Sequence, residues 1–90
     1  MLLMKMGQAG TLESNDIIIT VSEAEKGSGI QVELTSIVLP QFGQMIRHTL
    51  ERVCQHEGVT DVLITASDKG ALDYTIAARL KTALQRAGMI

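Results

Sequence analysis

The first half of the chain alternates hydrophobic and polar residues, which is typical of half-buried β-strands. Two runs, residues 17–22 and 30–35, place hydrophobic side chains at every second position. These side chains are Ile17, Ile19 and Val21 in the first run and Ile30, Val32 and Leu34 in the second. The segment between the runs is charged and contains glycine, which suits a hairpin loop. We therefore predict two strands joined by a short loop and paired antiparallel.

From Ser36 onward the hydrophobic spacing changes to three and four residues, which indicates one face of a helix. The residues on this face are Phe42, Met45, Ile46, Thr49, Leu50 and Val53. Ser36 suits the N-cap of this helix, and Pro40 is tolerated in a first turn. Gly58 is a typical residue for ending it.

The last third of the chain again changes from the alternating pattern of a strand to the three- and four-residue spacing of a helix. Residues 60–66 predict a third strand that carries Val62, Ile64 and Ala66 on one face, and residues 67–70 predict a turn. A second amphipathic helix follows and ends at Gly88. Its hydrophobic residues are Leu72, Ile76, Ala77, Leu80, Ala83, Leu84 and Ala87.

The order of these elements, β-β-α-β-α, defines the expected fold class. A hydrophobic sheet face and two amphipathic helices bury their apolar surface most simply as two layers. We therefore predict an α+β two-layer sandwich, in which a small mixed sheet of three or four strands carries both helices on one face. Ninety residues make one domain, residues 1–90. Residues 1–8 are expected to be a flexible terminus, and residues 9–16 a loop or a short edge strand.

Composition narrows the function classes. The formal net charge is −2, and aromatic residues make up only 2% of the chain. Both values disfavour nucleic-acid binding, which needs clustered Lys and Arg and often stacking aromatics. The one cysteine, Cys54, excludes an internal disulfide and a cysteine-based zinc site, and fits a cytoplasmic protein. No apolar run approaches the ~20 residues that span a membrane.

Motifs of catalysis are absent from the sequence. It contains no glycine-rich phosphate loop of the known kinds. His48 and His56 lie about two turns apart on the first predicted helix, without a partner at metal-ligand spacing, so we interpret them as solvated. Cys54 borders the apolar face of that helix and is expected to be buried and inert. No catalytic or metal-binding residue is predicted.

Two segments retain candidate chemistry. Residues 9–16 place Ser14 among small and polar residues, either as an accessible hydroxyl or as a turn former that caps the backbone. Residues 67–73 place Lys69 beside the start of the second helix. This segment is either a helix cap, made by Asp68 or Ser67, or an anion site, made by Lys69 and the free N–H groups of the helix. Residue chemistry alone favours the capping interpretation at both segments.

Taken in order, three segments resemble the acyl carrier protein of citrate lyase, its gamma subunit. The similarity extends from about residue 9 to residue 88, and each segment is weak alone while the ordered set is specific. The segments are Ala9-Gly10-Thr11-Leu12-Glu13-Ser14; Gln41-Phe42-Gly43 with Ile46-Arg47 and Thr49; and Asp68-Lys69-Gly70-Ala71-Leu72-Asp73 with Ala78-Arg79, Ala83-Leu84 and Arg86-Ala87.

The resemblance implies a non-catalytic carrier subunit. It implies that Ser14 holds a covalent prosthetic group, phosphoribosyl-dephospho-coenzyme A, through a phosphodiester, and that a separate transferase installs it. It further implies partnership with an acyltransferase (alpha) and a lyase (beta) subunit, in a complex that cleaves citrate to acetate and oxaloacetate. Lys69 is a second candidate, as a cation that holds the phosphodiester or a partner surface.

Two alternatives stay open at the level of sequence. One is the carrier subunit of malonate decarboxylase, which uses a similar prosthetic group. The other is a small α/β ligand-binding or regulatory module that carries no covalent group. A phosphopantetheine carrier of the fatty-acid type is disfavoured, because its Asp-Ser-Leu motif is missing and its helix bundle conflicts with the two β-rich runs.

Overall fold

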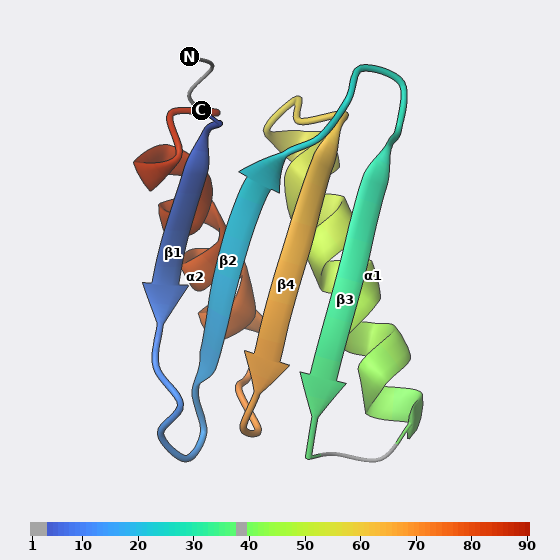
Figure 1. Cartoon of the computed structure of the whole chain (residues 1–90). Helices are drawn as coiled ribbons and strands as arrows, with labels where there is room; N and C mark the ends of the chain where they lie inside the picture. The colour runs from blue at the N-terminus through green and yellow to red at the C-terminus, as the bar shows by residue number, and fades with distance from the viewer. Residues whose placement is uncertain (1–3, 38–39) are drawn as a thin grey trace.

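The computed structural model describes residues 4–37 and 40–90, apart from the side chain of Gln41. It contains four strands and two helices within these residues (Figure 1). In chain order they are β1 (Met6–Gly10), β2 (Ile17–Glu23), β3 (Ile30–Ser36), α1 (Pro40–His56), β4 (Val62–Asp68) and α2 (Asp73–Arg86).

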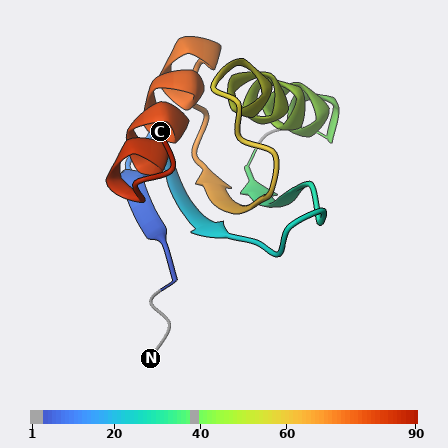
Figure 2. The same cartoon turned by 90° about the horizontal axis from the view of Figure 1, so that it is seen from above.

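The strands form one mixed sheet in the order β1-β2-β4-β3. The pairs β1–β2 and β2–β4 are antiparallel, and β3–β4 is parallel. Seen along the strands, α1 and α2 lie side by side on one face, and no helix of the described residues covers the opposite face (Figure 2). The predicted α+β two-layer sandwich, with a small mixed sheet and both helices on one face, is therefore confirmed.

The predicted pairing of the two β-rich runs is wrong, because β4 lies between β2 and β3. The apolar face of β4 (Val62, Ile64, Ala66) is fully covered, whereas β3 is only half-buried along its length. The strand whose apolar face is fully covered therefore lies inside the sheet, and the half-buried strand lies at its edge. The loop after β2 passes the start of β4, where the Asp61 carboxylate accepts hydrogen bonds from the N–H groups of Gly27 and Gly29, at 3.0 and 2.9 Å.

Strand β1 is an addition to the predicted order. Met6 to Gln8, expected in a flexible terminus, pair with β2, in a register that places Ala9 opposite Ile19. Ala9 is buried, and α2 lies so close that a Cβ on Gly7 would overlap the carbonyl oxygen of Ala83. The edge strand suggested for residues 9–16 therefore lies earlier, and residues 11–16 form the loop that joins β1 to β2.

Both helices end as predicted and begin later than predicted. Gly58 follows α1 and Gly88 follows α2, and in each case the next N–H bonds back to a carbonyl of the last turn. Ser36 is not the N-cap of α1: it ends β3, and its hydroxyl donates to Asp68 at 2.9 Å. The N-cap of α2 is Leu72, which makes no side-chain cap.

The core is aliphatic, as the shortage of aromatic residues predicts. Ile, Val, Leu and Ala from the sheet and both helices fill it, together with the fully buried Cys54. Its largest fully buried members are Ile17, Ile19, Leu50, Ile64, Ile76, Leu80 and Leu84. Over the residues that the structure describes, no helix is long and apolar enough to cross a membrane.

Candidate functional site

Ser14 lies in the loop of residues 11–16, at the end of the sheet where β1 stops and β2 starts. Its side chain is exposed, and its hydroxyl makes no hydrogen bond to any residue that the structure describes. The loop follows Gly10, whose φ of 100° and contact with the backbone of Ile17 leave no room for a side chain. The sequence therefore presents this hydroxyl to solvent on a tight turn.

Asp16 fixes this loop to the rest of the molecule. Its carboxylate accepts two hydrogen bonds from the guanidinium of Arg79 on α2, at 2.9 and 3.1 Å. It also accepts from the Thr11 hydroxyl at 2.6 Å and from the N–H of Ile17 at 2.7 Å. The hydrogen bonds from Arg79 and Thr11 lower the pKa of Asp16 to about 2, so the carboxylate is ionised at neutral pH. One buried charge thus joins both ends of the loop to a helix.

The loop between β4 and α2 lies against the Ser14 loop. The N–H of Asn15 donates to the carbonyl of Lys69 and the N–H of Lys69 donates to the carbonyl of Asp16, both at 2.8 Å. The structure therefore brings the two sequence candidates, Ser14 and Lys69, to the same end of the sheet. The Lys69 ammonium group forms no ion pair with a described residue.

Asp68 has a different role from the one predicted. Its carboxylate accepts hydrogen bonds from the N–H groups of Gly70 and Ala71, at 3.1 and 3.0 Å, and so stabilises the turn before α2. It does not cap α2, which begins at Asp73. The first free N–H groups of that helix therefore lie several residues beyond Lys69, and the predicted anion site retains only the lysine and this turn.

Several exposed hydrophobic side chains belong to segments that lie at the end of the sheet with the Ser14 loop (Figure 1). They come from the Ser14 loop, the end of β3 and the first turns of both helices. We call this set the apolar rim: Leu12, Ile37, Phe42, Met45, Leu72 and Tyr74. Side chains of this kind at one end of a small protein are typical of a surface that meets another molecule.

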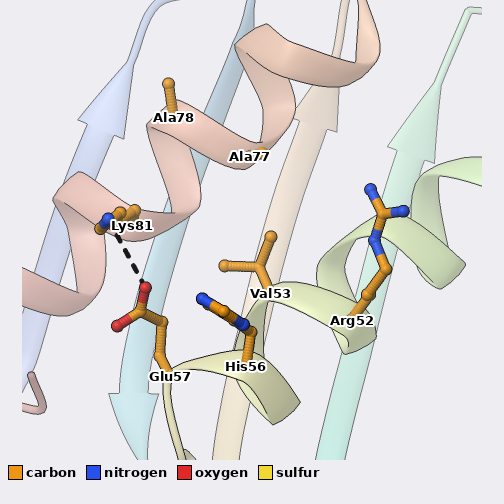
Figure 3. A pocket seen from close by; sticks show the side chains of 7 residues that line it. All are labelled: Arg52, Val53, His56, Glu57, Ala77, Ala78 and Lys81. Carbon is orange, nitrogen blue, oxygen red and sulfur yellow. Dashed lines mark ion pairs between the residues drawn. The ribbon is translucent and has the colours of Figure 1, made fainter.

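Among the described residues, cavities lie where α1 approaches α2 and where it approaches the loop before α2. The first, of about 340 Å³, is at the middle of α2 and the C-terminal half of α1, away from Ser14. Charged side chains surround it, among them Lys81 and Glu57, whose ion pair measures 3.6 Å (Figure 3). The second, of about 240 Å³, is mainly apolar, although Asp68 and Asp73 also line it, and lies at the Ser14 end, between the first turns of α1 and the loop before α2.

The predicted exposure or burial is found at three further residues, His48, His56 and Cys54. His48 and His56 are exposed on α1. Cys54 is fully buried, and burial raises the pKa of its thiol to about 11, which makes it a poor nucleophile. Within residues 4–37 and 40–90, no three His, Cys, Asp or Glu side chains are placed to hold a metal ion.

Sequence reasoning did not assign a role to the Asp16–Arg79 pair. Both residues belong to segments that were singled out, but they are 63 positions apart, and either charge would be an ordinary surface residue if alone. The available signal was an acidic residue, Asp16, just before a strand, together with an arginine, Arg79, beside the apolar face of a helix. The two side chains meet only because α2 packs against β1 and β2.

Comparisons with known proteins agree with this geometry. The family model described as "Malonate decarboxylase delta subunit (MdcD)", an acyl carrier protein family, matches residues 4–87. A chain of a crystal structure of a Pseudomonas malonate decarboxylase hetero-tetramer in complex with malonate superposes with a TM-score of 0.70 at 22% identity. The match covers 94% of this chain and 88% of that chain, and it establishes the fold. The class of protein is therefore a small acyl carrier subunit.

Closer relatives narrow the class. The citrate lyase acyl carrier protein of Streptococcus uberis is 49% identical over 94% of this chain and 82% of its own length. Those of Halothermothrix orenii and Serratia proteamaculans are 46% and 45% identical, over 92% and 97% of this chain and 86% and 84% of their own lengths. The chain belongs to the citrate lyase acyl carrier protein family, which confirms the resemblance drawn from its sequence. Members of this family are carriers and not catalysts.

Proposed function

We propose that this chain is the acyl carrier subunit of a citrate lyase, and that Ser14 is its attachment point for a coenzyme A-like prosthetic group. The group proposed is phosphoribosyl-dephospho-coenzyme A, joined to the Ser14 oxygen by a phosphodiester. The observation that carries the proposal is the exposed, unbonded Ser14 hydroxyl on a loop that the Asp16–Arg79 pair holds in place.

The residues present fit such a group. A modifying enzyme needs access to the hydroxyl, and Ser14 stands in solvent between exposed neighbours. No described side chain bonds to this hydroxyl as a base, so Ser14 is not activated by its own chain. A separate transferase would therefore install the group. When bound, the group supplies a thiol that holds acetyl or citryl as a thioester.

The chain's own residues would position this group. The hydrogen bonds of Asp16 to Arg79, Thr11 and Ile17 hold the loop, and with it the attachment point, in one place. An acyl group tethered there stays at high effective concentration near each partner site. The ammonium of Lys69 lies in the neighbouring loop and is available to pair with the phosphodiester. The partners proposed are the alpha (acyltransferase) and beta (lyase) subunits, which would contact the apolar rim. The complex would cleave citrate to acetate and oxaloacetate in the cytoplasm.

Intact mass after co-expression with the prosthetic-group transferase tests the attachment point. The wild-type chain is expected to gain the mass of the group in full, and Ser14→Ala to gain none. Ser28→Ala is the matched control, because Ser28 is an exposed loop serine between β2 and β3. It is expected to be modified like the wild type. Added mass on Ser14→Ala would contradict the proposal.

Two further measurements separate the alternatives. A wild-type chain that keeps its sequence mass in the presence of the transferase would favour the unmodified ligand-binding or regulatory module. A modified chain that restores activity to malonate decarboxylase subunits, and not to citrate lyase alpha and beta, would favour the other carrier system. Lys69→Ala is expected to slow modification or lower lyase activity, and wild-type values for both would remove Lys69 from the proposed site.

A further inference from the structure

The apolar cavity at the Ser14 end is the feature that the proposed carrier role does not yet use. It lies between the first turns of α1 and the start of α2, and has a volume of about 240 Å³. Its walls are mainly Phe42, Met45, Ile46, Ala71, Leu72 and Ile76. Phe42, Met45 and Leu72 are 43%, 44% and 58% exposed, so the mouth of the cavity is a hydrophobic surface in contact with water.

This cavity begins next to the attachment point. Gly70 is part of its wall, and a Cβ on Gly70 would lie 3.7 Å from the side-chain oxygen of Asn15, the residue after Ser14. The backbone bond from Asn15 to Lys69, at 2.8 Å, holds the two loops together at this point. A group tethered to Ser14 therefore reaches the cavity through its first segment and has no need to fold back.

The size and chemistry of the cavity select one part of such a group. A volume of 240 Å³ corresponds to on the order of eight water molecules, which is enough for a planar bicyclic ring and too little for a whole coenzyme. Apolar walls exclude the charged phosphates. Phe42 offers an aromatic ring for stacking, and the exposed carboxylate of Asp73 at the edge offers an acceptor for an amino group.

We propose that this cavity binds the adenine base of the group tethered to Ser14. The inference rests on the proposed function, because it requires a coenzyme A-like group at that serine. Binding the base fixes the nucleotide part of the arm against α1 and α2 and leaves only the distal, thiol-bearing part free to move between partner sites. Tethering gives the base a millimolar local concentration, so that a pocket with weak affinity is occupied.

NMR of the modified protein tests this inference. The chain is labelled at isoleucine and methionine methyl groups and compared before and after modification, with intact mass confirming the added group in each sample. The methyl resonances of Met45, Ile46 and Ile76 are expected to shift on modification and to show nuclear Overhauser effects to the adenine ring protons. Met89, near the opposite end of α2, is expected to stay unchanged.

Two aromatic variants provide the matched comparison. Phe42→Ala removes a wall of the cavity and is expected to lose the Overhauser effects to adenine while still gaining the full mass. Tyr74→Ala removes an exposed aromatic side chain at the same end that does not line the cavity, and is expected to keep them. Full mass without Overhauser effects in the wild type overturns this inference alone. A wild-type chain that gains no mass overturns the proposed function and this inference with it.

Discussion

The anchoring of the Ser14 loop by Asp16 gives a quantitative prediction about stability and pH. Asp16 is buried, with 9% of its surface exposed. Its carboxylate accepts hydrogen bonds from Arg79, Thr11 and the N–H of Ile17. The Asp16→Asn substitution keeps the shape of the side chain and removes its charge. We expect it to destabilise the protein at neutral pH and to have little effect in strong acid.

The magnitude follows from the pKa of Asp16. The fall from 3.8 to about 2 is a difference of ~1.8 pKa units, and one unit corresponds to 1.36 kcal/mol, which gives an upper value of ~2.4 kcal/mol. The Arg79 side chain is 40% exposed, and solvent screening lowers the contribution of such a pair. We therefore expect Asp16→Asn to lower the free energy of unfolding by about 1–2 kcal/mol at pH 7.

The dependence on pH has a definite sign. Because the pKa of Asp16 is lower in the folded than in the unfolded chain, ionisation stabilises the fold. This contribution is complete above about pH 5 and is lost as the pH falls through 3.8 towards about 2. The difference in unfolding free energy between wild type and Asp16→Asn should therefore shrink from its full value at pH 5–7 to near zero at pH 2.

Urea unfolding followed by far-ultraviolet circular dichroism measures this difference, since the chain has no tryptophan for fluorescence. Glu13→Gln is the matched control, because Glu13 is an exposed carboxylate in the same loop. Its unfolding curve is expected to follow the wild type at every pH. Equal stability of wild type and Asp16→Asn at pH 7, or a difference that persists unchanged at pH 2, would refute the assigned role of the ion pair.

Three further outcomes are expected. Gly10→Ala should lower the free energy of unfolding by more than about 1 kcal/mol, and by more than Gly27→Ala, because both residues have positive φ but only Gly10 contacts other backbone; equal losses in urea unfolding would contradict this. Cys54 should be unreactive towards a disulfide reagent at pH 8 in the native protein and react with one equivalent in urea, since burial raises its thiol pKa to about 11; fast native labelling would oppose this. Leu80→Ala should lower stability by about 2–5 kcal/mol, whereas the exposed Leu12→Ala should change it by less than ~0.5 kcal/mol; similar values for the two variants would place Leu80 outside the core.

Most elements of the fold could be predicted because burial imposes a period on the sequence. The alternation of Ile17, Ile19 and Val21 and the helical spacing of Ile76 and Leu80 both record which face meets the core. Strand β1 was not predicted, because it is five residues long and contains two glycines, and because its burial comes from contact with α2. The pairing of β2 with β4 was not predicted, because strands that are neighbours along the chain need not be neighbours in a sheet.

The candidate site was predictable to a different degree. Ser14 was found through resemblance to a family, since residue chemistry alone favoured a capping serine there. Its proximity to Lys69 depends on two backbone hydrogen bonds between loops that are far apart in the sequence. The hold of Arg79 on Asp16 is equally a product of tertiary packing. The resemblance therefore points to the Ser14 hydroxyl, while the contacts that hold its loop arise only from tertiary packing.

The direction in which the strands run has a practical consequence. Strand β1 starts, and the chain reaches Ile90, at the end of the strands opposite the Ser14 loop (Figure 1). An affinity tag, a fluorescent protein or a surface linker joined to Ile90 would therefore start far from that serine. Immobilisation or labelling through Ile90 is thus expected to leave the proposed attachment point open to large macromolecules.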